Sequence, residues 1–306
     1  MTKTAFLFAG QGAQYLGMAR DLYDQHEVVR ATFEEASQVL GYDLRVLIDS
    51  DEEKLNQTRY TQPAILTTSV AIYRLLEEKG VKPDMVAGLS LGEYSALVAA
   101  GVLDFKEAVA LVAKRGRYME EAAPAGSGKM VAVLNADLAS IETACKEASS
   151  LGIVTPANYN TPAQIVIGGE VAAVDKAVEL LTAAGVKRLI PLKVSGPFHT
   201  ALLEPASQRL AQALEKVKIS EPLFPVVGNT EARIMEKEQI KNLLTRQVKE
   251  PVRFYESIAT MQAAGVTKFV EIGPGKILSG FVKKIDKAAG LAHVEDEASL
   301  AALLEK

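Results

Sequence analysis

Short apolar runs alternate with longer amphipathic stretches along the N-terminal part of the chain. The run at residues 5–9 is apolar throughout and leads into Gly10-Gln-Gly12, which predicts a buried strand ending in a turn. Apolar positions are spaced for helices over residues 15–40, 61–79 and 105–123, and the short run at 85–87 predicts a second buried strand. This alternation predicts an α/β fold with a mostly parallel sheet.

The pattern changes after the break at Ala125-Gly-Ser-Gly128. Predicted strands at 129–134, 153–158, 164–167 and 188–194 alternate with predicted helices at 138–148 and 171–184 in the order β-α-β-β-α-β. That order is typical of a ferredoxin-like unit. We therefore expect a large α/β domain, residues 1–125 and 195–306, with a ferredoxin-like small domain inserted at 126–194. A helix at 200–217 and strands at 224–228 and 268–272 resume the large domain.

The composition is that of an ordinary globular enzyme, with 306 residues, 48% hydrophobic and 24% charged. The net charge of −4 and the scattered basic residues argue against a nucleic-acid partner, and no apolar stretch is long enough to cross a bilayer. The single cysteine, Cys145, excludes a disulfide framework, and its amphipathic helical context predicts a buried or half-buried thiol. We expect a cytoplasmic protein without a membrane segment, metal or cofactor.

A serine stands between two glycines where the second predicted strand meets a helical pattern. The stretch Gly88-Leu-Ser-Leu-Gly92 matches G-x-S-x-G. Glycines two positions before and after Ser90 let the backbone turn sharply, which can present the hydroxyl as a nucleophile. A plain turn whose serine caps the following helix is an equally weighted alternative.

A serine nucleophile needs a base, because its free hydroxyl reacts poorly at neutral pH. The chain has three histidines. We expect His26, in a polar helical stretch, and His293, near the charged C-terminus, at the surface. His199 lies where the insert returns to the large domain, a common place for a site, so it is the candidate base by elimination. A histidine held at a helix end by backbone contacts is the alternative.

Two further features could serve such a site. The turn at Gly10-Gln-Gly12 lacks the third glycine of a dinucleotide fingerprint, since Tyr15 stands there. It could instead offer a backbone N–H to an oxyanion, together with the N–H of Leu91. Arg115 and Arg117 follow on the next predicted helix, and one that faced inward would suit a carboxylate. The sequence alone does not select which one.

Seven motifs together resemble one family closely. They stand in that family's order nearly from one end of the chain to the other. The motifs are Phe8-Ala-Gly-Gln-Gly-Ala-Gln14, Gly88-Leu-Ser-Leu-Gly-Glu-Tyr-Ser-Ala96, Arg115-Gly-Arg-Tyr-Met119, Ala157-Asn-Tyr-Asn-Thr-Pro162, Gly196-Pro-Phe-His199, Gln247-Val-Lys-Glu-Pro-Val-Arg253 and Glu271-Ile-Gly-Pro-Gly275. The family is that of the malonyl-CoA:acyl carrier protein transacylases. Leu89 stands where many relatives have His, which we treat as neutral for catalysis.

The resemblance implies a hydrolase-like large domain with a ferredoxin-like insert, and a ping-pong acyl transfer. Ser90 would attack malonyl-CoA with His199 as base, and the resulting malonyl ester would pass to the phosphopantetheine thiol of acyl carrier protein. The N–H groups of Gln11 and Leu91 would hold the oxyanion. Backbone carbonyls, rather than an acid, would orient the histidine. The product would supply chain-extender units for fatty-acid biosynthesis.

The resemblance also assigns substrate-binding residues. Arg115 would pair with the free malonyl carboxylate, and Gln247 matches the family's glutamine near the site. Asn158, with Asn160 as a second candidate, would line the pantetheine side of the cleft. Phe198 would crowd an α-substituent and so disfavour methylmalonyl groups. We expect a monomer.

Other functions remain to be separated from this one. A serine thioesterase or esterase would share the turn but release acid without a thiol acceptor, and a non-catalytic module would bind carrier protein without forming an adduct. An acidic carrier protein would need a local basic patch on this acidic chain. Lys187-Arg188 and Lys283-Lys284 are the candidates.

Overall fold

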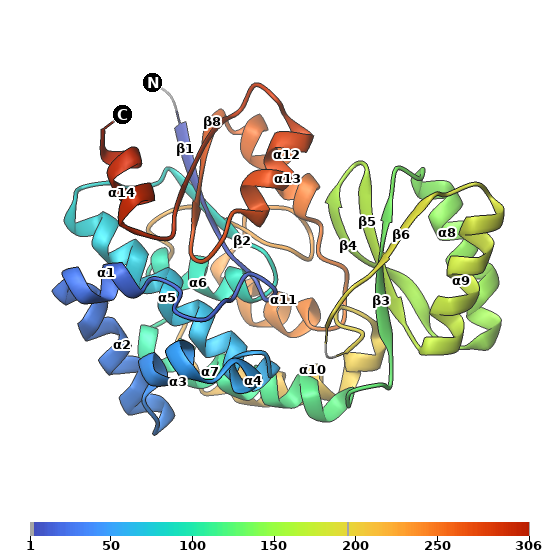
Figure 1. Ribbon diagram of the computed structural model, residues 1–306, viewed down its shortest axis with the longest axis horizontal. Helices are drawn as coiled ribbons and strands as arrows, with labels where there is room; N and C mark the ends of the chain where they lie inside the picture. The colour runs from blue at the N-terminus through green and yellow to red at the C-terminus, as the bar shows by residue number, and fades with distance from the viewer. Residues whose placement is uncertain (1–2, 195, 306) are drawn as a thin grey trace.

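The computed structural model describes residues 3–194 and 196–305 (Figure 1). A five-stranded sheet forms the centre of its larger part, in the strand order β7-β2-β1-β8-β9, and every pair of neighbours is parallel. Its strands are β1 (Lys3–Phe8), β2 (Met85–Gly88), β7 (Val226–Val227), β8 (Val266–Ile272) and β9 (Gly290–Val294). The prediction of a mostly parallel sheet in an α/β fold is confirmed.

Helices cover both faces of this sheet. They are α1 (Arg20–Gln25), α2 (Glu27–Leu40), α3 (Leu44–Ser50), α4 (Glu52–Leu55), α5 (Thr58–Glu78), α6 (Leu91–Ala99), α7 (Phe105–Ala122), α10 (Glu204–Glu215), α11 (Ile240–Gln247), α12 (Phe254–Ala263), α13 (Ile277–Ile285) and α14 (Glu297–Leu304). Side chains alternate along β1, so that Phe6 and Phe8 join the core under α5 and α7, whereas Ala5 and Leu7 join the core under α12 and α13. Both faces are buried, as a parallel sheet requires.

A second, four-stranded sheet forms the smaller part, in the order β4-β5-β3-β6 with antiparallel neighbours. Its elements are β3 (Lys129–Leu134), α8 (Leu138–Ala148), β4 (Val154–Thr161), β5 (Gln164–Gly169), α9 (Val171–Ala183) and β6 (Arg188–Pro191). Figure 1 shows α8 and α9 on the outer face of this sheet. Cys145 lies in the core beneath them, where burial raises the pKa of its thiol to about 12, so the thiol stays protonated.

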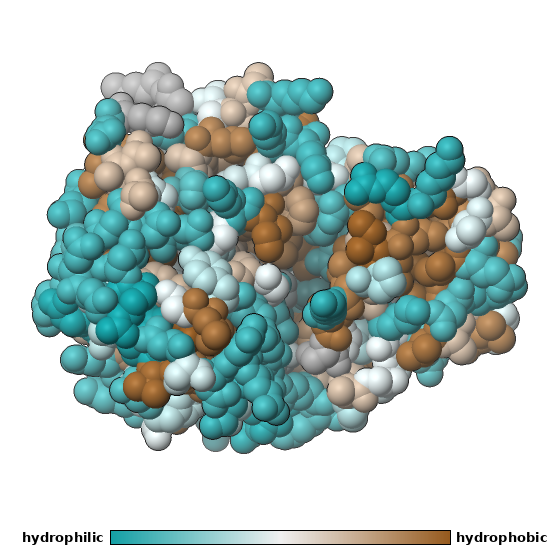
Figure 2. Space-filling view, viewed as in Figure 1, coloured by the Kyte–Doolittle hydropathy of each residue, from teal (hydrophilic) through white to brown (hydrophobic). Residues whose placement is uncertain are grey.

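The element order of the small part is the predicted one. The domain limits of 125/126 and 194/195 stay a prediction, and residue 195 lies outside the described residues. The two parts are joined by backbone hydrogen bonds as well as by chain connections: Tyr159 N–H donates to Val252 O (2.8 Å) and Val252 N–H to Ala157 O (2.9 Å). Figure 2 shows the surface hollowed where the two parts meet, with apolar side chains on the small part.

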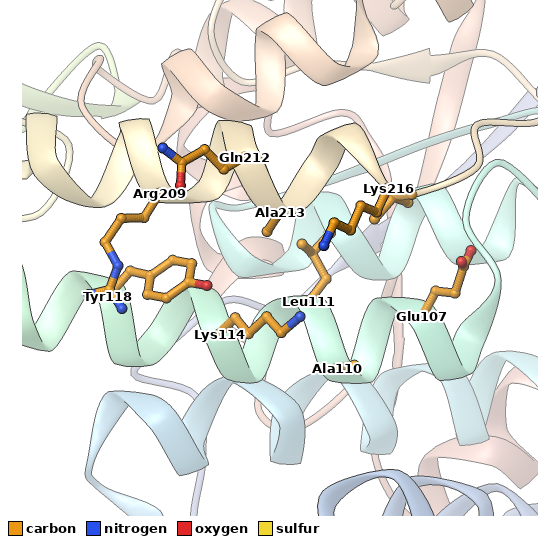
Figure 3. A pocket seen from close by; sticks show the side chains of 10 residues that line it. Glu107, Ala110, Leu111, Lys114, Tyr118, Arg209, Gln212, Ala213 and Lys216 are labelled. Atoms are coloured by element: carbon orange, nitrogen blue, oxygen red, sulfur yellow. The ribbon is translucent and has the colours of Figure 1, made fainter.

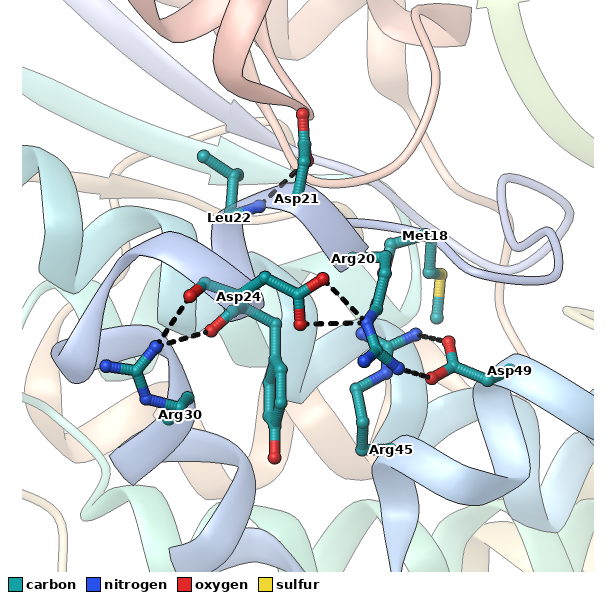
Figure 4. Close-up of polar contacts among 9 residues, drawn as sticks. Met18, Arg20, Asp21, Leu22, Asp24, Arg30, Arg45 and Asp49 are labelled. Carbon is teal, nitrogen blue, oxygen red and sulfur yellow. Dashed lines mark hydrogen bonds and ion pairs between the residues drawn. The ribbon is translucent and has the colours of Figure 1, made fainter.

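The predicted helix over 15–40 is wrong at residues 15–19, which are not helical, and it is two helices rather than one. Gly17 and Ala19 adopt left-handed backbone conformations (φ 73° and 55°), which no α-helix continues through, and His26 is extended between α1 and α2. Charged side chains join α1 to α3 (Figure 4). Arg20 lies between Asp24 (2.9 Å) and Asp49 (2.5 Å), and Arg45 shares Asp49. None of the helices in the described parts of the chain is long and apolar enough to cross a membrane.

Candidate active site

Ser90 occupies a strained turn between β2 and α6. Its backbone has φ 52° and ψ −106°, a region that L-residues rarely adopt. The flanking glycines are required by space, because a Cβ on Gly88 would lie 2.0 Å from the carbonyl carbon of Gly92, and one on Gly92 would lie 2.1 Å from Phe8 O. The strand, turn and helix therefore approach more closely than any side chain would allow, and they leave Ser90 partly exposed.

The structure brings His199 onto this serine from 109 residues further along the chain. Ser90 Oγ lies 2.8 Å from His199 Nε2, and His199 Nδ1 lies 2.6 Å from the backbone oxygen of Gln247. Because a carbonyl oxygen only accepts, Nδ1 must carry the proton and Nε2 must be the acceptor for the serine hydroxyl. The imidazole is thus held in the tautomer that a general base needs, without a carboxylate behind it.

His199 is uncharged at neutral pH. It is buried, and burial lowers the pKa of its imidazole to about 4, with the nearby positive charge of Arg115 as the second cause. The hydrogen bond to Gln247 opposes this shift only in part. Nε2 is therefore free to accept a proton over the whole physiological pH range.

Arg115 is the arginine that faces inward, whereas Arg117 is exposed and lies 3.8 Å from Glu121. The Arg115 side chain is 1% exposed, and burial lowers the pKa of its guanidinium. Nη1 donates to Gln62 Oε1 (2.8 Å), and Nη2 donates to Gln247 Oε1 (3.0 Å) and to Ser90 Oγ (3.2 Å). No carboxylate lies within ion-pair distance of it in the described part of the chain.

Gln247, at the C-terminal end of α11, connects these groups. Its backbone oxygen holds His199, its Oε1 accepts from Arg115, and its Nε2 donates to the backbone oxygen of Ser90 (2.9 Å). Its side chain is 1% exposed. One residue therefore fixes the relative positions of Ser90, His199 and Arg115.

The backbone N–H groups of Gln11 and Leu91 lie at the same edge of the sheet. β1 and β2 are parallel neighbours with Phe8 opposite Gly88, so the turns that follow both strands leave the sheet together. Leu91 is the first residue of α6, where no intrahelical acceptor exists for its N–H. Neither N–H donates to an acceptor among the described residues, and the Gln11 side chain is held by Thr58 Oγ1 (3.1 Å).

The remaining predicted site residues lie around this centre. Phe198 is 7% exposed and belongs to the large core cluster beside His199. Asn158 and Asn160 lie on β4, and Asn158 forms a bridge with Val252 of the large part. Asn160 is 6% exposed, and its Oδ1 has no partner among the described residues. No hydrogen bond joins either asparagine to Ser90 or His199 within the described chain.

The other two histidines belong to different places. His26 contacts Glu297, and His293 lies 3.6 Å from Glu295. Both are partly buried rather than fully at the surface as expected, because each packs against a glutamate of the C-terminal segment.

Three buried polar residues of the site were missed by sequence reasoning. Gln62 on α5 supports Arg115, Glu93 on α6 lies one turn after Ser90, and Asn229 follows β7. The available signal was a polar residue in an otherwise buried position: Gln62 stands before the apolar run of α5, and Asn229 stands directly after a strand of a parallel sheet, where sites collect.

A separate groove of about 530 Å³ lies between α7 and α10 (Figure 3). Lys114 and Tyr118 reach into it from α7, and Arg209 and Lys216 from the α10 side. It is lined by none of the residues around Ser90. No group of three or more His, Cys, Asp or Glu side chains placed to hold a metal is found in the described residues.

Comparison with known proteins agrees with this geometry. The model of the acyl transferase domain family matches residues 5–303. The malonyl CoA-acyl carrier protein transacylase of Escherichia coli K12 is 46% identical over 308 residues and covers all of both chains.

Two solved structures are similar to this chain over nearly its whole length. The crystal structure of MCAT from Streptococcus pneumoniae is 76% identical, covers 99% of each chain and has a TM-score of 0.97. PlMCAT, in complex with AntF, a type II PKS acyl-carrier protein, is 48% identical with 99% coverage of each chain and a TM-score of 0.97. With a serine turn, a neutral histidine and a family match over nearly its whole length, the chain belongs to the acyl transferase family and is an acyltransferase.

Proposed function

We propose that this enzyme transfers the malonyl group from malonyl-CoA to the phosphopantetheine thiol of acyl carrier protein, through a malonyl ester on Ser90. The names of its relatives support both substrates, since they are malonyl-CoA:acyl carrier protein transacylases and one is in complex with a carrier protein. We also propose that it acts as a cytoplasmic monomer that supplies chain-extender units for fatty-acid biosynthesis.

The observation that carries the proposal is the state of Arg115. Its buried guanidinium has no ion pair among the described residues, and the charge of Glu93 opposes only in part the burial that lowers its pKa, so a ligand carboxylate would stabilise it. Nη2 lies 3.2 Å from Ser90 Oγ, so a carboxylate on a group attached at that oxygen would reach the guanidinium. Malonyl has its free carboxylate one methylene beyond the reacting carbonyl, which suits so short a separation.

In the first half-reaction, His199 Nε2 takes the hydroxyl proton as Ser90 Oγ bonds to the thioester carbonyl carbon. The carbonyl oxygen becomes an oxyanion, which the N–H groups of Gln11 and Leu91 would stabilise. When the intermediate collapses, the C–S bond breaks and the sulfur of coenzyme A leaves with the proton from His199. The malonyl group remains as an ester on Ser90.

The second half-reaction runs the same steps with a thiol as nucleophile. The carrier-protein thiol gives its proton to His199 Nε2, and its sulfur attacks the ester carbonyl. Collapse breaks the bond to Ser90 Oγ, which recovers the proton. Gln247 would hold Arg115 and His199 in fixed relative positions through both half-reactions. Phe198 would shape the acyl side of the site, and Asn158 and Asn160 would shape its pantetheine side.

A serine hydrolase is the competing function, and water would then replace the thiol. The test is the intact mass of the enzyme after brief mixing with malonyl-CoA, without carrier protein. We expect a single malonyl adduct on the wild type and none on Ser90→Ala. Release of coenzyme A without an accumulating adduct would indicate a hydrolase, and neither release nor adduct would overturn the malonyl assignment.

A further inference from the structure

We propose that Asn229 is a positioning residue whose side-chain amide holds the strained turn of Ser90 in its reactive conformation. The inference rests on the proposed function only in taking Ser90 as the nucleophile. A non-glycine residue at φ 52° persists only where its surroundings enforce that conformation. The following helix begins after Ser90, so the turn cannot enforce it through α-helical hydrogen bonds alone.

The Asn229 amide spans the turn. Its Nδ2 donates to Gly88 O (2.6 Å), and its Oδ1 accepts from Ser90 N–H (2.7 Å). These two backbone groups lie on either side of Leu89, so one planar amide fixes both ends of the peptide segment that leads into Ser90. The arrangement needs a donor and an acceptor together, which Asn supplies; an ionised Asp lacks the donor, and Ala lacks both.

Asn229 is itself fixed by the element that it holds. Its backbone N–H donates to Glu93 Oε2 (2.6 Å) on α6, three residues after Ser90, and its backbone oxygen accepts from Arg253 N–H (2.9 Å). The residue is completely buried. Ser90, Glu93 and Asn229 thus form a closed set of contacts between the turn, the helix and the end of β7.

The same amide reaches the rest of the site. Asn229 Oδ1 lies 3.3 Å from Gln247 Nε2, and that nitrogen also donates to Ser90 O. Both lone-pair directions of Oδ1 are used, one for the turn and one for the residue that holds His199. Loss of the Asn229 amide should therefore disturb the reacting geometry of Ser90 with His199, beyond any loss of stability.

The experiment measures the reactivity of Ser90 with phenylmethanesulfonyl fluoride, followed by intact mass. Ser90 Oγ would bond to sulfur, fluoride would leave, and His199 would take the proton. The variants are Asn229→Ala and Asn229→Asp. Ser257→Ala is the matched control, because the Ser257 hydroxyl is buried and donates to Gly228 O (3.3 Å) and Arg253 O (2.9 Å) without touching the turn. Rates are expressed per folded molecule, and malonyl-CoA loading is measured in parallel.

We expect Asn229→Ala to slow both reactions about 10- to 100-fold, the scale of a small misplacement of reacting groups. Ser257→Ala should stay within about twofold of the wild type, since it shares no partner with the turn. A rate for Asn229→Ala within that same range would overturn the proposal. If the wild type is sulfonylated but takes no malonyl group, the proposed function fails and the Asn229 comparison still decides this inference. If it reacts with neither reagent, both fail.

The isosteric variant separates positioning from folding. In Asn229→Asp, an ionised carboxyl cannot donate to Gly88 O, whereas a protonated one can. Of the ionisable residues, Glu93 on α6 and the backbone of Arg253 contact residue 229 directly, and Arg115 on α7 and His199 reach it through Gln247. All four are also present in the wild type and in Asn229→Ala. The rate of Asn229→Asp should therefore rise relative to those two enzymes as the pH falls from about 8 to about 5.5, a range in which a buried carboxyl takes up a proton. No relative rise would overturn the proposal.

Discussion

Replacing Arg115 by Met should remove selectivity for a carboxylated acyl group while leaving the chemistry of Ser90 in place. Gln62 takes one hydrogen of Nη1, and Gln247 takes one of Nη2. The second hydrogen of Nη2 faces Ser90 Oγ, and a substrate carboxylate could take it in place of that oxygen, together with the second hydrogen of Nη1. Hydrogen bonds to charged groups contribute about 1.5–3 kcal/mol each. Two of them give about 3–6 kcal/mol, and since about 1.4 kcal/mol is a factor of ten in rate, kcat/KM for malonyl-CoA should fall about 10²- to 10⁴-fold.

The assay is rapid-quench loading of Ser90, with malonyl-CoA and acetyl-CoA compared on the same enzyme preparations. Acetyl has no carboxylate to lose, so its loading rate should change far less and the malonyl-to-acetyl preference should collapse. Arg117→Ala is the control, because Arg117 is exposed on the same helix. An equal loss with both donors would refute the reasoning, since it would mean that Arg115 supports the fold or the nucleophile and does not recognise the acyl group.

Three further outcomes follow from the structure. The pKa of His199 is about 4 in the folded protein and 6.5 ordinarily, so on acidification the unfolded chain takes up a proton before the folded one does. Between about pH 6.5 and pH 4, the wild type should therefore lose more unfolding free energy than His199→Gln. Urea denaturation at several pH values measures this difference. Reversing both charges at 187–188 should raise KM for carrier protein and spare KM for malonyl-CoA, with 283–284 as the comparison pair; equal effects on both substrates would exclude steering by that patch. Gly92→Ala should lower the unfolding free energy by about 1–3 kcal/mol, because the added methyl group would overpack against Phe8. Gly280→Ala, on a helix with open space around it, should not lower it. Equal melting temperatures for the two variants would contradict this.

Local patterns in the sequence were sufficient where the fold is local. The apolar run of β2 and the two glycines around Ser90 predicted the strand, turn and helix, because the space at Gly88 is limited by Gly92 and Glu93 in the same turn. The helical period of α7 also indicates which of its two arginines is buried. Leu111, Arg115 and Met119 are four residues apart and share the buried face of α7, so the spacing alone could have selected Arg115 over Arg117.

Contacts between distant parts of the chain could not be predicted in this way. Asn229 meets Ser90 across 139 residues, and Gln62 meets Arg115 across 53, so no periodicity records either contact. The helices α3 and α4 were missed because they are short and their caps are single aspartates, Asp43 and Asp51, inside a charged stretch. The resemblance to a family named Gln247, but only the structure shows that its backbone and side chain contact four partners at once, His199, Arg115, Ser90 and Asn229.

The electrostatics of the site link recognition of the acyl group to the strength of the base. In the free enzyme, burial and then the positive charge of Arg115 lower the pKa of His199, and the nearby Glu93 acts on Arg115 without forming an ion pair among the described residues. A malonyl carboxylate bound to Arg115 would supply the neutralising charge, and the pKa of His199 would then rise from about 4 toward its ordinary value. A base works best when its pKa approaches the working pH, so the correct substrate would strengthen the base that attacks it. An acetyl group brings no such charge. Arg115 would then discriminate against acetyl twice, because it finds no carboxylate to bind and because its charge keeps the pKa of His199 low.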